Sequence, residues 1–206
     1  ATQNPLLYSG RITATARTQR HTKQETLWAI KAISRLSGVR WATSNYVRSA
    51  FVTPNDTLYS EQWHYPQIRL PQAWDVTTGS ADVTVAVIDT GILSRHPDFA
   101  GQLTLGADLI SDSENAGDGN GVDSDPEDIG DGGLGDGSSS FHGTHVAGTI
   151  AAATDNNLGV SGVAWNSRIM PVRVLGRSGG TSFDLIQSIR FAAGLSNTSN
   201  MLPIQA

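Results

Sequence analysis

The chain has 206 residues, a formal net charge of -5 and no cysteine. This length is enough to bury the core of one or two domains, and the lack of cysteine excludes disulfides, thiolate metal sites and cysteine nucleophiles within the chain. No apolar run approaches the roughly 20 residues of a membrane span, so no membrane partner is expected.

The charge is divided unevenly along the chain. Residues 1–50 hold eight of the 14 Lys and Arg residues and one acid, Glu25, which gives them a net charge near +7. Residues 51–206 hold six bases and 18 acids and are near -12. The asymmetry predicts two functionally different pieces that attract each other, and it makes nucleic acid a poor partner for the acidic piece.

The first third of the chain predicts one helix, one strand and an irregular connection. The spacing of apolar residues predicts an amphipathic helix over 23–39, with Gly38 as its C-terminal stop. Residues 39–51 predict a strand. Residues 53–74 contain three prolines and predict an extended segment pinned to a surface, with a short helical turn at its end.

Strands and helices alternate in the remainder. Residues 83–89, VTVAVID, are apolar on both alternating faces, which is typical of a parallel strand covered on both sides. After a loop rich in Gly, Asp and Ser, the sequence predicts a helix from His142, a strand over 168–175, and a helix whose N-cap is Thr181 or Ser182. This order predicts a βαβ arrangement and an α/β fold with a parallel sheet.

The first of these strands ends in Asp89-Thr90-Gly91, a tripeptide that aspartic proteases also carry. An all-β aspartic protease does not account for the strand–helix–strand pattern. In a parallel sheet, reactive groups gather at the carboxyl ends of strands, and His142 opens the next helix. An imidazole there can receive a carboxylate on one nitrogen and activate a nucleophile with the other.

Two longer motifs carry a resemblance to a known family. VAVIDTGILSRHPDF and HGTHVAGTIAA, the latter followed by NNLGVSGVAW, resemble the Asp and His motifs of the subtilisin-like serine peptidases. The similarity runs from about Asn55 to about Gly194. It implies a three-layer α/β fold with a parallel central sheet, here incomplete, in which Asp89 orients the imidazole and His142 is general base and then general acid.

The same helix carries a second histidine, His145. The resemblance implies a structural hydrogen bond for it. A zinc pair formed with His142 fits the spacing, but the expected glutamate base and third ligand are missing.

The resemblance also implies that the catalytic serine and the oxyanion asparagine lie beyond Ala206, so the chain is expected to be inactive alone. Ser182, in GGTSF, lies where a helix needs its cap, and we do not take it as the nucleophile. Residues 171–194 resemble the family's groove-lining edge strand and the helix after it. The residues expected to border the substrate are Leu175, a strand made of Gly179, Gly180 and Thr181, and Phe183.

Residues 1–52 resemble the C-terminal part of the family's propeptide, a small α+β remnant with inhibitory and chaperone-like roles, and 53–206 the N-terminal portion of the peptidase domain. Self-cleavage is then expected between Arg48 and Pro54. The alternative is an ordinary N-terminal extension. The resemblance further implies a secreted zymogen whose signal peptide is not in this chain, a monomer when complete, and two kinds of partner, its own propeptide and protein or peptide substrates.

The resemblance implies structural Ca²⁺ as the cofactor. The expected ligands of one site are two carboxylates, an amide oxygen and three backbone carbonyls: Asp56, Asp98, Asn156, Thr154, Leu158 and Val160. The acidic loop 111–137 offers a D-x-N-x-x-D-x-D spacing that resembles a second calcium loop, with Asp118, Asn120, Asp123 and Asp125. The alternative for this loop is a solvated acidic segment.

Two functions remain open. The leading one is a truncated part of a calcium-stabilised serine endopeptidase that works by an Asp-His-Ser triad. The alternative is a non-catalytic binding or inhibitory fragment that ends at Ala206. The preferred cleavage residue is not readable, because no segment of the chain resembles the family's primary specificity pocket.

Overall fold

The computed structural model describes residues 19–44, 52–131 and 138–196. The chain divides into two compact units, Ala1–Arg48 and Ser49–Ala206. In the first unit, helix α1 spans Gln19–Ile33 and so confirms a helix here, although it ends five residues before Gly38. Residues 39–44 contain no strand, so that part of the predicted strand is wrong, and 45–51 lie outside the described residues.

The second unit begins with three short helical elements, η1 (Tyr59–Glu61), α2 (His64–Gln67) and α3 (Leu70–Trp74). The predicted turn near Trp74 is confirmed, but the extended segment before it is wrong. Tyr65 and Trp74 are buried in one aromatic cluster. The hydroxyl of Tyr65 donates to the backbone carbonyl of Ser161 (2.6 Å), and Nε1 of Trp74 donates to that of Val163 (2.9 Å). Helical turns are favoured here because they bring both rings onto the 161–165 segment.

A three-stranded sheet forms the centre of this unit. Strands β1 (Thr84–Asp89), β3 (Arg168–Arg173) and β2 (Ala107–Asp108) lie in the order β1-β3-β2, and both pairings are parallel. The register places Asp89 opposite Arg173. The parallel sheet predicted from the apolar runs is therefore confirmed, and β2 is an addition that the sequence pattern did not reveal.

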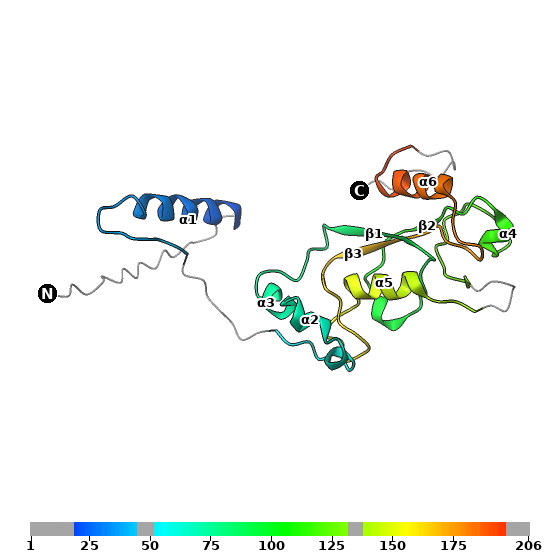
Figure 1. The fold of residues 1–206 in the computed structure, drawn as a ribbon, viewed down its shortest axis with the longest axis horizontal. Helices are drawn as coiled ribbons and strands as arrows, with labels where there is room; N and C mark the ends of the chain where they lie inside the picture. The colour runs from blue at the N-terminus through cyan, green and yellow to red at the C-terminus, as the bar shows by residue number, and fades with distance from the viewer. Residues whose placement is uncertain (1–18, 45–51, 132–137, 197–206) are drawn as a thin grey trace. The chain divides into compact units, whose positions relative to one another are not determined.

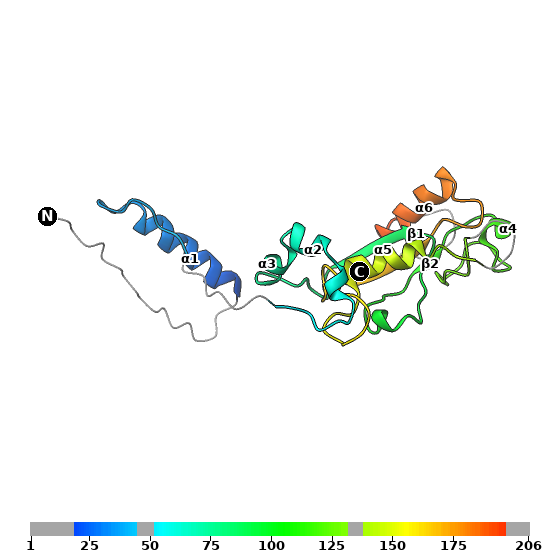
Figure 2. The ribbon, with the colours of Figure 1, turned by 60° about the horizontal axis from the view of Figure 1, so that its bottom comes forward.

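Helices cover the two faces of the sheet. Alternate residues of β1 contribute to two separate apolar clusters, Val85 and Val87 to one and Ala86 and Ile88 to the other. Helix α5 (His142–Ala151) packs into the first cluster and α6 (Ser182–Ala192) into the second. Figures 1 and 2 show the sheet between these helices, which confirms the three-layer α/β arrangement.

The remaining elements are short. The 3₁₀ helix η2 spans Pro97–Phe99, and helix α4 (Ser113–Ala116) interrupts the acidic loop, which is otherwise irregular where it is described. Among the described helices, none has the length and apolar character needed to cross a bilayer.

Candidate active site

Asp89 and His142 face each other across 53 positions of sequence. The Nδ1 atom of His142 lies 2.8 Å from Oδ1 and 2.9 Å from Oδ2 of Asp89. The carboxylate is largely buried, with 13% of its side chain exposed, whereas 62% of the imidazole is exposed. Within the described residues, Nε2 of His142 makes no hydrogen bond. The ring is thus held on one side and open to an incoming group on the other.

The backbone brings these two residues together because a glycine lies close to each of them, Gly91 after Asp89 and Gly143 after His142. Asp89 ends β1 and His142 begins α5, after Phe141 in a left-handed conformation (φ 49°). A β-carbon at Gly143 would overlap the carbonyl of Gly91 and lie 3.1 Å from Cβ of Asp89. Only glycine at 143 lets the start of the helix approach the end of the strand this closely.

The surroundings of the pair make the imidazole more basic. The backbone N–H of Thr90 donates to Oδ1 of Asp89 at 2.7 Å. The hydrogen bond that the His142 ring donates to Asp89, and then the negative charge of Asp89, raise the pKa of His142 above its ordinary value of 6.5, and the charge of Asp131 adds to this. An imidazole of raised pKa next to a fixed carboxylate can accept a proton and keep it through a reaction step.

The residues expected to border the substrate lie on a turn and at the start of α6. Gly176 and Gly179 pair through two backbone hydrogen bonds of 3.0 and 3.1 Å, so 176–179 is a tight turn and the edge strand expected at 179–181 is not present. Leu175 precedes the turn and its N–H points to the carbonyl of Asp89 at 3.2 Å. Gly179, Gly180, Thr181 and Phe183 are all exposed.

Asn115 of α4 holds this turn from the acidic loop. Its Oδ1 accepts from the N–H of Ser178 (2.7 Å), its Nδ2 donates to the carbonyl of Gly179 (2.9 Å), and its own carbonyl accepts from Arg177 (3.0 Å). The side-chain amide thus replaces a partner strand for the turn. The shape of this expected substrate border depends on a residue about 60 positions earlier in the chain.

Ser182 is the first residue of α6, and Thr181 is the N-cap. The hydroxyl of Thr181 accepts from the N–H of Asp184 at 3.0 Å. Of the two caps that the sequence allowed, the structure has Thr181. Ser182 occupies an ordinary first-turn position and is not bonded to His142.

The carboxylates expected at the first calcium site, Asp56 and Asp98, converge on one loop, residues 154–161. Their residues are 5% and 2% exposed, and neither has a basic side chain in contact among the described residues. Asp56 accepts from the N–H of Asp155 (3.0 Å) and the hydroxyl of Ser161 (2.8 Å). Two buried carboxylates without a positive partner fit a hard cation such as Ca²⁺.

Of the other residues expected at this site, Asn156 and Val160 contact Asp98 through nitrogen. The amide Nδ2 of Asn156 donates to Asp98 Oδ1 (3.1 Å), and the N–H of Val160 donates to Oδ2 (3.0 Å). The N–H of Leu158 donates to Oδ1 of Asn156, and the Thr154 hydroxyl accepts from Gly162. The assignment of these residues as calcium ligands stays a prediction.

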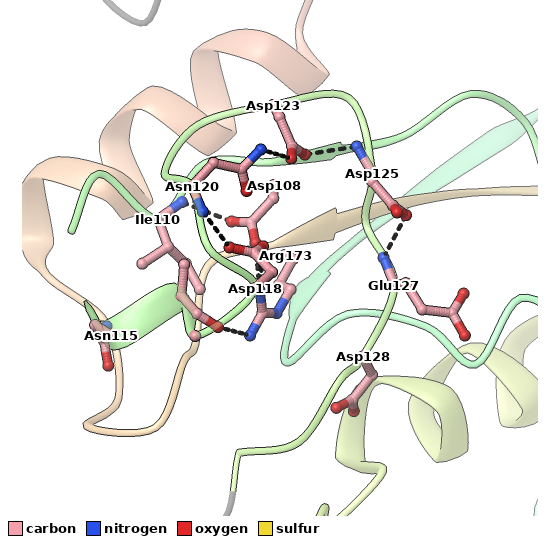
Figure 3. A network of polar contacts seen from close by, with 12 residues as sticks. Asp108, Ile110, Asn115, Asp118, Asn120, Asp123, Asp125, Glu127, Asp128 and Arg173 are labelled. Carbon is pink, nitrogen blue, oxygen red and sulfur yellow. Dashed lines mark hydrogen bonds and ion pairs between the residues drawn. The ribbon is translucent and has the colours of Figure 1, made fainter. Parts of the chain in front are cut away.

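The acidic loop is organised around Arg173, at the end of β3. Its guanidinium donates to Asp108 (2.5 Å), to Asp118 (3.3 Å) and to the carbonyl of Ala116 (2.7 Å), and the Arg173 residue is 1% exposed. Figure 3 shows this cluster and the loop that folds over it. Burial raises the pKa of Asp108 to about 6, against the lowering effect of the Ile110 N–H and of Arg173.

The carboxylates expected at a second calcium site are engaged within this loop. Asp118 pairs with Arg173, Asp123 accepts from Asn120 Nδ2 (2.7 Å), and Asp123 and Asp125 each accept a backbone N–H two residues on. Figure 3 shows these contacts in sequence along the loop. In the part of the chain that the structure describes, no three acids or histidines group as for a metal. The second site stays a prediction.

His145 lies in the wall of a pocket of about 760 Å³ beside α5, together with Leu93, His96 and Phe99. Its ring makes no hydrogen bond to another described residue, so the expected structural hydrogen bond is absent there. The pair of His142 and His145 has no third ligand among the described residues, which leaves the zinc reading without support.

Two acids near the dyad were not singled out from the sequence. Asp128 accepts from the hydroxyls of Thr90 and Ser139, and Asp131 accepts from the N–H and the hydroxyl of Ser140. Both lie in the Asp-rich stretch that was interpreted as a calcium loop or a solvated segment. Their spacing from His142 carries no recognisable pattern, so only the folded chain distinguishes them from their neighbours.

Comparisons with known proteins agree with this geometry. Residues 80–202 match the subtilase (Peptidase S8) family. The chain is 48% identical over 157 residues to an extracellular protease of Xanthomonas campestris pv. campestris, covering 70% of this chain and 27% of that protein. It is 38% identical over 143 residues to thermitase of Thermoactinomyces vulgaris, covering 68% of this chain and 44% of thermitase.

A solved structure described as proteases from Pseudoalteromonas arctica superimposes with a TM-score of 0.67 at 45% identity. The match covers 74% of this chain and 48% of the other. The chain therefore spans less than half the length of each of these relatives.

Proposed function

Because this chain belongs to the subtilase family, we propose that it is part of a serine endopeptidase in which Asp89 and His142 are two members of an Asp–His–Ser triad. One observation carries the proposal, the pairing of His142 Nδ1 with the buried Asp89 carboxylate at 2.8 Å while Nε2 stays open. Relatives named as proteases support the reaction class.

In the proposed mechanism, Nε2 of His142 takes the proton of a serine hydroxyl as that oxygen attacks the peptide carbonyl. Asp89 holds the Nδ1 proton and stabilises the imidazolium that forms. The imidazolium then gives its proton to the leaving amine, and water repeats the sequence to release the acyl group. The nucleophile in this proposal is a serine outside residues 1–206. The match covers only 27% of the Xanthomonas protease and 44% of thermitase, which supports a nucleophile in the part of the fold that this sequence does not include.

The turn 176–179 and the start of α6 are proposed to border the bound peptide. Residues 175–183 continue directly from β3, whose end is paired with Asp89. The exposed backbone of Gly180 is available for main-chain hydrogen bonds to an extended substrate, whereas the N–H and the carbonyl of Gly179 are engaged with Gly176 and Asn115. Phe183, also exposed, would contact a substrate side chain.

We further propose that the protein is secreted as a zymogen. Relatives from Xanthomonas campestris and Dichelobacter nodosus are named extracellular, which supports secretion. The basic first unit and the acidic second unit have the charges expected of a propeptide and its peptidase domain. The proposed partners are this propeptide and protein substrates.

A Ca²⁺ ion held by Asp56, Asp98 and the loop 154–160 is proposed to stabilise the second unit. The ion would neutralise the two buried carboxylates and fix the loop that they share. It would take no part in the chemical step.

The proposed function is tested on protein made from the complete coding sequence. The wild type should hydrolyse casein and react with a fluorophosphonate, and mass spectrometry should find the label on a serine outside residues 1–206. His142→Ala should abolish both hydrolysis and labelling, and Asp89→Asn should slow both by about 10⁴-fold. A label on Ser182, or hydrolysis that pepstatin-type inhibitors block, would overturn the proposal. Binding of proteins without hydrolysis would favour the non-catalytic alternative.

A further inference from the structure

Asp128 is a buried carboxylate outside the catalytic pair. Its residue is 5% exposed, and it lies on the acidic loop beyond the cluster around Arg173 (Figure 3). It accepts three hydrogen bonds, from the hydroxyl of Thr90 (3.0 Å), the hydroxyl of Ser139 (2.8 Å) and the N–H of Gly130 (3.0 Å). No basic side chain contacts it among the described residues. These three donors are what compensates its burial.

The partners of Asp128 belong to the two segments that carry the catalytic pair. Thr90 follows Asp89 directly, and its N–H donates to the Asp89 carboxylate. Ser139 lies three residues before His142, and its hydroxyl also accepts from the N–H of Phe141 at 3.0 Å. One carboxylate therefore contacts both the end of β1 and the turn that leads into α5.

The direction of each bond requires an acceptor at position 128. The hydroxyl of Thr90 accepts from the N–H of Gly143 at 3.0 Å, which leaves its single hydrogen for Asp128. The hydroxyl of Ser139 likewise accepts from the N–H of Phe141, so its single hydrogen is also left for Asp128. Asparagine has one acceptor oxygen, so it cannot receive both hydroxyls and the Gly130 N–H as the two carboxylate oxygens do.

We propose that Asp128 is a positioning residue for the reaction, whose carboxylate ties Thr90 to Ser139 and so keeps Asp89 and His142 face to face. The inference rests on the proposed function, since the pair has a reaction to serve only in a peptidase. Asp128 acts through Thr90 and Ser139, and none of its hydrogen bonds reaches residues 175–183.

Loss of this tie should therefore lower turnover and leave substrate binding alone. A misplacement of about 1 Å in a catalytic pair costs about 10²-fold in rate. We expect kcat to fall by about 10- to 100-fold in Asp128→Asn, with KM unchanged.

The test uses the full-length protein and two variants of Thr90 that do not change its charge. Thr90→Val keeps the shape of residue 90 but removes the hydroxyl, whereas Thr90→Ser keeps it. Glu114→Gln is the control, because it removes one negative charge from an exposed position of the same loop. The proposal expects reduced kcat in Asp128→Asn and Thr90→Val, near wild-type kcat in Thr90→Ser, and no change in Glu114→Gln.

A second readout does not depend on activity. Because the Asp89 hydrogen bond raises the pKa of His142, loosening the pair should bring this pKa down toward 6.5, and NMR titration of the ring measures it. Thr90→Val should lower it and Thr90→Ser should not. If Asp128→Asn does not fold, Ser139→Ala is used in place of that variant. It removes one of the three hydrogen bonds to Asp128, at a half-buried residue.

Folded Thr90→Val and Ser139→Ala proteins with wild-type kcat and an unchanged His142 pKa would overturn the positioning role. If the wild type itself shows no hydrolysis, the proposed function fails, and the His142 titration still decides whether Asp128 holds the pair. A lowered pKa in Asp128→Asn, which leaves the Gly143–Thr90 hydrogen bond in place, then supports the positioning role by itself.

Discussion

The guanidinium of Arg173 lies 2.5 Å from the carboxylate of Asp108, and both residues are almost entirely buried. The two residues are 65 positions apart and end neighbouring strands of the sheet. We expect Arg173→Met to destabilise the protein by about 3 to 5 kcal/mol, because it leaves Asp108 buried without a positive partner. Urea unfolding measures the loss.

The double variant Arg173→Met, Asp108→Asn should recover much of that stability, since it removes the unpaired charge as well. Arg177→Met is the matched control, because Arg177 is exposed and its side chain makes one long hydrogen bond, to the carbonyl of Gly117. Equal stability of Arg173→Met and Arg177→Met would contradict the role of the buried pair.

The raised pKa of Asp108 predicts a pH dependence of stability. The folded state keeps a proton on Asp108 up to about pH 6, whereas the unfolded chain releases it near 3.8. The folded state thus binds more protons between these values, so stability should fall as the pH rises from about 4 to about 6, by at most about 3 kcal/mol. Asp108→Asn should flatten this part of the stability profile, and Asp82→Asn, at an exposed site, should not.

The raised pKa of His142 predicts the acid limb of the activity profile. The imidazole must be neutral to accept a proton, so kcat/KM should rise with pH through a pKa above 6.5. Asp89→Asn removes the cause of the shift and should move this limb to lower pH, while kcat falls by about 10⁴-fold, as in other triads of this type. A limb that stays in place in Asp89→Asn would mean that another group titrates.

The contacts of Asn115 predict an effect on substrate binding. Asn115→Ala removes two side-chain hydrogen bonds from the turn 176–179, each worth about 1 kcal/mol. We expect KM for a peptide substrate to rise by up to about 30-fold with little change in kcat. Asn115→Asp, which keeps the acceptor for Ser178 but loses the donor to Gly179, should give an intermediate value. An unchanged KM in Asn115→Ala would exclude the turn from the substrate border.

The buried carboxylates Asp56 and Asp98 predict stabilisation by calcium. Addition of a chelator should lower the Tm of the wild type, and restoring Ca²⁺ should reverse the change. Asp98→Asn should be less stable with Ca²⁺ present and should respond little to the chelator. Asp112→Asn, which removes an exposed acid of the other loop, should respond as the wild type does. A wild-type Tm that ignores the chelator would contradict the proposed site.

The sequence predicted those elements whose pattern is set by burial on the sheet. The strand ending at Asp89 and the strand ending at Arg173 are apolar on both faces because helices cover both sides, and both were recognised. The positions of Asp89 and His142 followed from the ends of these elements. The two side chains lie within hydrogen-bond distance of each other, and their catalytic roles stay a prediction.

Features that depend on distant partners were missed. β2 is two residues long and exists only through its pairing with β3. The helical turns around Tyr65 form because its hydroxyl reaches Ser161, a contact that local propensity does not contain. No edge strand forms at 179–181, because the chain turns over 176–179 and Asn115 occupies the backbone groups of Ser178 and Gly179 that a neighbouring strand would take.

The acidic loop shows the same limit in its chemistry. Asp118 and Asp128 look alike in a run of acids, yet one pairs with Arg173 and the other holds Thr90 and Ser139. The sequence gives no sign of this difference, since each partner is 11 to 55 positions away.

The acidic loop has an exposed position between its two attachments, Gly119, at which we expect the chain to accept foreign sequence. Gly119 has open space around it, and it lies between the segment fastened to Arg173 and the segment fastened to Thr90. Residues inserted there would lie between two anchored segments of the loop and leave Asp89 and His142 undisturbed. A tag or a recognition peptide for immobilisation could be carried at this point of the molecule.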